Sequence, residues 1–182
     1  MDRNYVAGEH IVLRKAREDD WRSMWKHIWG NEDVYRWMLF QPTLTEEEAK
    51  ARCLRSIAYQ REHDAWFVAL KDTDEAIGLC AIRENEPGHW EECGLGIGTA
   101  FQGKGYGKEL VGLMLDLAFV RFGAEDVRYG YFRENVRSRK TAEHFGFQYD
   151  HTEAMTRPWD GTVKVVDSCL LTREKYLEKF GK

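Results

Sequence analysis

Residues 90–112 read WEECGLGIGTAFQGKGYGKELVG, and glycine occupies six of the positions from 94 to 107. Glycine inside a strand packs nothing and costs entropy, so a cluster of glycines in a strand usually marks a close approach to the backbone. From residue 106 onward, apolar residues recur at helical spacing until Gly123, which is typical of a helix end. This stretch therefore predicts a strand, a glycine-rich turn and a helix.

The turn in this stretch has the features of an anion-binding site. Its sequence is QGKGYG, residues 102–107. Glycines let successive N–H groups point inward, and the first turn of the helix adds N–H groups without intrahelical partners and the positive end of the helix dipole. Lys104 and Lys108 add positive charge. Together these features predict a cradle for a phosphate group.

Two nucleotide-binding motifs are alternative explanations for such a cradle. Residues 98–104 fit GxxxxGK, which is most of a P-loop, but Gly105 stands where a P-loop needs Ser or Thr to hold magnesium. A dinucleotide-binding fold needs GxGxxG near the start of a βαβ unit, whereas this chain has GxGxG in mid-chain. A nucleotide-binding module is therefore the less favoured hypothesis.

Periodicity over the rest of the chain predicts one domain covering residues 1–182. Strands are expected at 10–16, 65–70, 76–83, 91–97, 127–133, 147–156 and 163–171. Helices are expected at 18–29, 32–39, 45–63, 106–122 and 135–145. The order β α α β β β α β α β β predicts an α+β, or mixed α/β, fold with a largely antiparallel central sheet flanked by helices.

Composition excludes several classes of function. The 182 residues are 43% hydrophobic and 32% charged, as in soluble globular proteins, and the net charge of −4 gives no bulk reason to bind nucleic acid. No segment resembles a signal peptide or a membrane span. The four cysteines form no CxxC pair and the six histidines show no ligand spacing. We therefore expect a cytoplasmic protein with no metal, no membrane and no nucleic-acid partner.

Two motifs, in this order, resemble those of the GNAT N-acetyltransferases. The first is Gln102-x-x-Gly105-x-Gly107, which follows a strand and opens a helix. The second, NVRSRKTAEHFGF at 135–147, resembles the NxxSxxxAExxGF segment of the branch that includes ribosomal-protein N-terminal acetyltransferases. Two further segments fit that branch: LR at 13–14 and LTREKY at 171–176. The resemblance covers nearly the whole chain and implies transfer of an acetyl group to a primary amine.

The resemblance also implies acetyl-CoA as the cosubstrate. In such enzymes the strand before the first motif splays from its neighbour, pairs with the pantetheine arm and offers one N–H to the thioester oxygen. The matching residues are Leu95, Gly96 and Ile97. The residues expected around the pyrophosphate are Gln102, Gly103, Lys104, Gly105, Tyr106, Gly107 and Lys108. Asn135 would bond the cofactor arm, and it is equally suited to cap the helix that it begins.

The implied reaction is direct attack of a neutral amine on the thioester, for which a base is useful. Glu91 and Glu92 are adjacent in a strand and point to opposite faces. Glu92 matches the acidic position of the family strand and is the expected base, while two solvated carboxylates remain the alternative. Cys93 has no activating cation beside it in sequence, so we do not expect a covalent route.

The departing CoA thiolate can accept a proton from a hydroxyl. Many relatives use a tyrosine seven residues after the asparagine, and that position is Ala142 here. Ser138 matches the serine of the N-terminal acetyltransferase branch and is the expected acid, with a polar residue in the helix's first turn as the alternative. A non-catalytic acyl-CoA-binding sensor of the same fold is a rival hypothesis, and the missing tyrosine is its one support.

The acceptor site in relatives lies between the first two helices and the last strands. The candidates here are Trp37, Met38 and Phe40, which flank a helix end, with Arg157, Trp159 and Asp160 from the last hairpin. A site rich in aromatic rings suits a protein N-terminus or a small-molecule amine. The sequence leaves open which acceptor is used, which acyl chain is preferred, and whether the protein is a monomer or a homodimer.

Overall fold

The computed structural model describes residues 4–181, which fall into two compact units. The first unit holds residues 4–81 and 93–113, and the second holds 82–92 and 114–181. Eight strands among the described residues are hydrogen-bonded in the order β1-β2-β3-β4-β5-β6-β8-β7. The sheet is largely antiparallel, with β5 and β6 as a parallel pair, so the predicted fold class is confirmed.

Strands of the first unit form antiparallel neighbours. They are β1 (Tyr5–Ala7), β2 (Ile11–Arg14), β3 (Ala65–Leu70) and the first part of β4 (Ala76–Glu86). All four residues of β2 are buried, as are the first five of β3. Strands buried on both faces read as continuous apolar runs, which is why both strands were recognisable in the sequence.

The α-helices that lie wholly within the first unit are α1 (Trp21–Met24), α2 (Glu32–Tyr35) and α3 (Glu46–Glu62). Met24, Ile28 and Trp29 pack with Cys53 of α3 and Phe67 of β3 in the core. α3 begins where the capping residues predicted, because the Thr45 hydroxyl accepts the Glu48 N–H at 3.2 Å.

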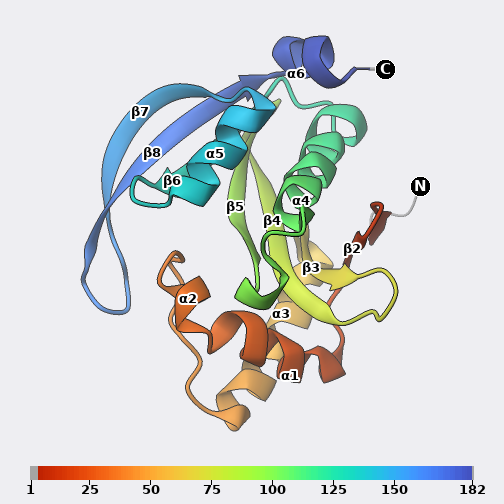
Figure 1. Ribbon diagram of the computed structural model, residues 1–182, viewed down its shortest axis with the longest axis vertical. Helices are drawn as coiled ribbons and strands as arrows, with labels where there is room; N and C mark the ends of the chain where they lie inside the picture. The colour runs from red at the N-terminus through yellow and green to blue at the C-terminus, as the bar shows by residue number, and fades with distance from the viewer. Residues whose placement is uncertain (1–3, 182) are drawn as a thin grey trace. The chain divides into compact units, whose positions relative to one another are not determined.

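The second unit is built around β6 (Asp126–Phe132) and a long ribbon of β7 (Gln148–Thr156) and β8 (Val163–Thr172) (Figure 1). In the sequence, α5 (Val136–Phe145) lies between β6 and β7, and its predicted limits are confirmed. Asn135 caps its start, and Gly146 ends it with a φ of 86°, a left-handed conformation that favours glycine. α6 (Arg173–Phe180) follows β8 directly.

Three helical predictions need correction. The helix expected at 18–29 is a 3-10 turn, α1 and a π-helical turn at Trp25–Trp29. α2 ends at Tyr35 rather than 39, and the helix expected at 106–122 is α4 (Tyr106–Leu115) followed by a π-helical turn at Asp116–Arg121. Apolar spacing alone does not distinguish α from π winding. α6, like the three-residue β1, was not expected.

α6 escaped prediction because little of it is buried. Tyr176 is the one buried residue of this eight-residue helix, and its ring stacks on Phe119 at 4.7 Å. Thr172 caps the helix by accepting the Lys175 N–H at 3.4 Å. A helix this short is marginal in isolation, so tertiary contact stabilises it.

Candidate functional site

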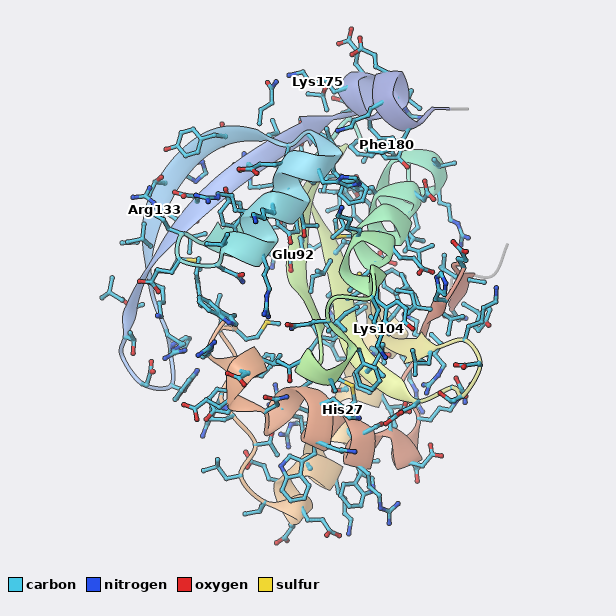
Figure 2. All side chains as sticks on the ribbon, in the orientation of Figure 1. His27, Glu92, Lys104, Arg133, Lys175 and Phe180 are labelled. Carbon is cyan, nitrogen blue, oxygen red and sulfur yellow. The ribbon has the colours of Figure 1, made fainter. Side chains whose placement is uncertain are left out.

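The glycine-rich turn joins β5 (His89–Ile97) to α4 in the first unit, and Lys104 lies in it (Figure 2). Gly98 N–H donates to the Ile77 carbonyl at 2.8 Å, which fixes the end of β5 to β4. One 3-10 turn, Thr99–Phe101, follows. The Gln102 side chain then donates to the Ile97 carbonyl at 3.2 Å. Gln102 therefore closes the loop between strand and turn rather than pointing away from it.

Two glycines of the turn adopt left-handed backbone conformations, with φ of 79° at Gly103 and 88° at Gly105. Side-chain-bearing residues rarely take this conformation. Apart from the glycine itself and its two chain neighbours, no described residue has an atom within 4 Å of the Cβ position at either glycine. The Gly105 carbonyl accepts the N–H groups of Lys108 and Glu109 at 3.0 and 3.1 Å, so α4 begins directly at the turn. The backbone at both glycines is therefore uncovered in the direction in which a side chain would project.

Glu109 anchors the first turn of α4, a role that sequence reasoning missed. Its carboxylate accepts the backbone N–H groups of His10 and Ile11 at 2.8 and 3.2 Å, and it lies 3.2 Å from the His10 ring. An acidic residue at this position also complements the helix dipole, so the sequence gave no sign of a second role. Because its oxygens are held by His10 and Ile11, at the start of β2, the carboxylate ties the first turn of α4 to that strand.

The backbone at Gly96 is approached closely from two sides. A Cβ on Gly78 of β4 would lie 2.3 Å from the Gly96 carbonyl oxygen. A Cβ on Gly96 itself would lie 2.3 Å from the terminal methyl of Met38. The structure thus brings together Met38, predicted to line the acceptor site, and Gly96, predicted to hold the cofactor. Leu95 is half-buried beside them and Ile97 is buried.

The other two predicted acceptor residues have partners of their own. The Trp37 ring lies 5.2 Å from the Arg36 guanidinium, and the Phe40 ring lies 4.3 Å from that of Arg52. Phe40 also packs against the core. Both rings are half-buried and so keep some accessible surface.

In the second unit, the adjacent residues Glu91 and Glu92 have different neighbours. β5 pairs in parallel with β6 from His89↔Asp126 to Glu91↔Arg128 and continues six residues further, to Ile97. Glu91 forms an ion pair with Arg83. Glu92, labelled in Figure 2, instead lies close enough for its charge to help raise the pKa of Tyr129. The opposite faces expected for these carboxylates thus have different surroundings.

Asn135 and Ser138 lie in the first turn of α5. The Asn135 side chain accepts the Ser138 N–H at 3.2 Å, which is the capping role that the sequence allowed. The Ser138 hydroxyl lies 2.8 Å from the Tyr129 hydroxyl of β6. Sequence reasoning missed Tyr129, since an alternating strand pattern predicts only that such a ring is buried. Glu92, Tyr129 and Ser138 thus place a carboxylate and two hydroxyls in one region of this unit.

The tip of the β7–β8 hairpin is held by its own side chains. Arg157 is buried, forms an ion pair with Asp160, and lies 4.3 Å from the Trp159 ring. The Arg157 guanidinium, more than any other group, lowers the pKa of the Asp160 carboxyl. Gly161 has a φ of 70° and completes the turn. These contacts make the tip a preformed loop.

Across residues 4–181 there is neither a cluster of metal-binding side chains nor a membrane-spanning helix. No grouping of His, Cys, Asp and Glu there is suited to hold a metal ion. No helix in the same residues combines the length and apolar character needed to cross a membrane. Cys93 is exposed on β5, and the thiols of Cys53, Cys80 and Cys169 are buried.

Known proteins resemble this chain along most of its length. The family model of the acetyltransferase (GNAT) domain matches residues 10–148. An uncharacterized N-acetyltransferase p20 of Bacillus licheniformis is 24% identical over 144 residues, which is 77% of this chain and 80% of that protein.

Solved structures show the same fold. A GNAT-family acetyltransferase from Bacillus anthracis has a TM-score of 0.79 at 16% identity, over 93% of this chain and 99% of that one. The ribosomal-protein-S5-alanine acetyltransferase of Vibrio fischeri has a TM-score of 0.75 at 16% identity, over 94% of this chain and 98% of that one.

Proposed function

The chain belongs to the GNAT acetyltransferase family, and on that premise we propose that it transfers acetyl from acetyl-CoA to a primary amine. The observation that carries the choice of cosubstrate is the glycine-rich turn, whose left-handed Gly103 and Gly105 open directly onto α4. Such a turn suits the pyrophosphate of CoA. Lys104 and Lys108 supply positive charge, and Gln102, Tyr106 and Gly107 complete the segment.

The pantetheine arm is assigned to the end of β5. The parallel pairing with β6 covers His89 to Glu91, so the backbone of Leu95, Gly96 and Ile97 is the part of the strand proposed to pair with the arm. Backbone N–H and C=O groups need partners, and a ligand amide can supply them. Asn135 is proposed to bond the arm while it caps α5.

Acyl transfer needs an amine that has lost its proton and a thiol that leaves. We assign the first task to Glu92, which matches the acidic position of the family strand and lies near Tyr129 in the same unit. The amine nitrogen attacks the thioester carbon, the C–S bond breaks, and the amine proton passes to Glu92 directly or through water. Ser138 is assigned to the sulfur, where its hydroxyl would donate to the departing thiolate.

The acceptor is proposed to be bound by Trp37, Met38 and Phe40. Met38 supports this assignment best, because its methyl lies against the Gly96 backbone, next to the proposed path of the cofactor. A protein N-terminus is the first acceptor class to test, since the ribosomal-protein-S5-alanine acetyltransferase of Vibrio fischeri shares the fold. Small-molecule amines are the second class.

The test is an acceptor panel that follows free-thiol release from acetyl-CoA. Peptides with free N-terminal alanine or serine, amino acids, polyamines and aminoglycosides are supplied in turn, with N-terminally blocked peptides as matched controls. Acceptor-dependent release supports the proposal. Binding of acetyl-CoA without release from any acceptor would identify an acyl-CoA-binding sensor, and binding of ATP–magnesium in place of CoA would identify a nucleotide-binding module.

A further inference from the structure

Tyr129 lies in the second unit, close to Glu92 and Ser138. Its side chain is 4% exposed, and its ring centroid lies 5.3 Å from that of Phe147 and 6.3 Å from that of Tyr131. The phenol is thus enclosed by rings on its apolar sides. Within residues 4–181, its one hydrogen-bond partner is the Ser138 hydroxyl, at 2.8 Å.

Either hydroxyl could donate in this pair, and the surroundings of Tyr129 decide which one does. Burial raises the pKa of Tyr129, and the nearby negative charge of Glu92 raises it further, so the phenol keeps its proton at all working pH values. A buried O–H without an acceptor costs free energy. Because Ser138 Oγ is the acceptor within reach of the buried phenol, the arrangement favours Tyr129 as the donor and Ser138 as the acceptor.

This direction leaves the proton of Ser138 for another acceptor. A serine hydroxyl has one donor and two acceptor lone pairs, and its hydrogen rotates to suit its partners. The backbone of Ser138 is fixed as well, since its N–H donates to Asn135. With the N–H and one lone pair both occupied, the remaining O–H points away from Tyr129.

We propose that Tyr129 is a positioning residue that holds the Ser138 hydroxyl as a donor for the departing sulfur. This inference rests on the role proposed above for Ser138. Tyr129 itself keeps its proton, because a phenolate would be buried beside the carboxylate of Glu92. It therefore acts through Ser138. Donation from the phenol also polarises the serine hydroxyl and makes it a better donor, as in other hydrogen-bond chains.

Removing the phenol hydroxyl should leave the Ser138 hydroxyl present but no longer held in one orientation. In Tyr129→Phe, the Ser138 hydroxyl loses the phenol that orients it and can rotate toward another acceptor, since a serine hydrogen turns to suit its partners. We expect kcat to fall by about two- to ten-fold, the effect of one neutral hydrogen bond. The KM for acetyl-CoA should stay within about two-fold, because no cofactor contact is assigned to Tyr129.

The experiment is a double-mutant cycle of Tyr129→Phe and Ser138→Ala, run with the fastest acceptor of the panel. kcat, the KM for acetyl-CoA and the melting temperature are measured for each variant. Tyr131→Phe is the matched control, since Tyr131 lies two residues along β6 and its hydroxyl contacts the Cys169 thiol at 3.7 Å, not Ser138. It removes the same atom from the same strand and should leave kcat unchanged.

The expected result is full coupling, in which Tyr129→Phe lowers kcat in the wild-type background and has no effect once Ser138 is alanine. An equal loss in both backgrounds, or a loss matched by Tyr131→Phe, would overturn the role of Tyr129. If Ser138→Ala lowers kcat and Tyr129→Phe does not, this inference fails while the proposed mechanism stands. If Ser138→Ala has no effect, or the panel shows no turnover, the proposed role of Ser138 fails and this inference fails with it.

Discussion

The terminal methyl of Met38 lies where a side chain on Gly96 would have to be, 2.3 Å from the Cβ position. Two residues 58 positions apart in the chain thus meet, because a side chain at position 96 would have to displace the methyl of Met38. Met38 is also unbranched and flexible, so it can move when something larger arrives. The proposed cofactor strand and the proposed acceptor residue therefore meet at one contact.

The first prediction follows from this contact. Gly96→Ala should destabilise the protein by about 1 kcal/mol, at the low end for overpacking because the obstacle is a flexible methyl group. In a Met38→Ala background the same change should cost clearly less, since the obstructing atoms are gone. Urea denaturation of the four proteins of this cycle measures both costs. Equal costs in both backgrounds would show that Met38 does not constrain Gly96.

The second prediction concerns the turn. Gly105→Val should abolish the rise in melting temperature that acetyl-CoA produces, because a β-branched side chain is strained at a φ of 88° and blocks the open backbone. Gly161→Val is the matched control: Gly161 also has a positive φ, 70°, and open space at its Cβ position, but it lies in the β7–β8 hairpin. It should lower the melting temperature yet keep the acetyl-CoA shift. Loss of the shift in both variants would point to general damage instead.

The third prediction separates the two glutamates. Glu92→Gln should lower kcat far more than acetyl-CoA affinity, and should flatten the acid limb of the pH–rate profile. The sign follows from the base role: a carboxylate accepts a proton only when ionised, so wild-type activity falls as pH drops through its pKa, and an amide has no such step. Glu91→Gln removes the partner of Arg83 and should leave the profile intact. The reverse pattern would assign the base to Glu91.

The fourth prediction separates two roles of Asn135. Asn135→Ala should cost about 1 kcal/mol of stability, because the cap on the Ser138 N–H is lost. Asn135→Asp keeps a capping oxygen and should retain most of that stability. If the amide also binds the cofactor arm, the aspartate variant should still bind acetyl-CoA more weakly. Undiminished affinity in a stable aspartate variant would restrict Asn135 to capping.

The features predicted from sequence are those whose causes are local. The limits of α5 follow from Asn135 at one end and Gly146 at the other, and the glycine-rich turn follows from Gly103 and Gly105. Each conformation is determined by the residue itself or by a neighbour within four positions. The helix cap, the helix end and the turn could therefore all be predicted from the sequence without knowledge of the fold.

The features missed depend on residues that meet only in the folded chain. Glu109 binds the backbone of His10, 99 positions earlier, and no local pattern marks such a contact. The Tyr129–Ser138 pair needs the register of β6 against the first turn of α5. The π-helical turns likewise reflect packing, since their apolar spacing also fits an α-helix. The roles of the site residues and the single domain over 1–182 stay predictions.

The most direct test of the central claim follows where the acetyl group goes. Acetyl-CoA labelled in its acetyl carbons is mixed with enzyme and the best acceptor of the panel, and both protein and acceptor are examined by mass spectrometry at early times. The account predicts that the label appears on the acceptor's amine in a one-to-one ratio with free CoA, and that the enzyme stays unlabelled. Label on Cys93 before it reaches the acceptor, or CoA release without any acetylated amine, would contradict direct transfer.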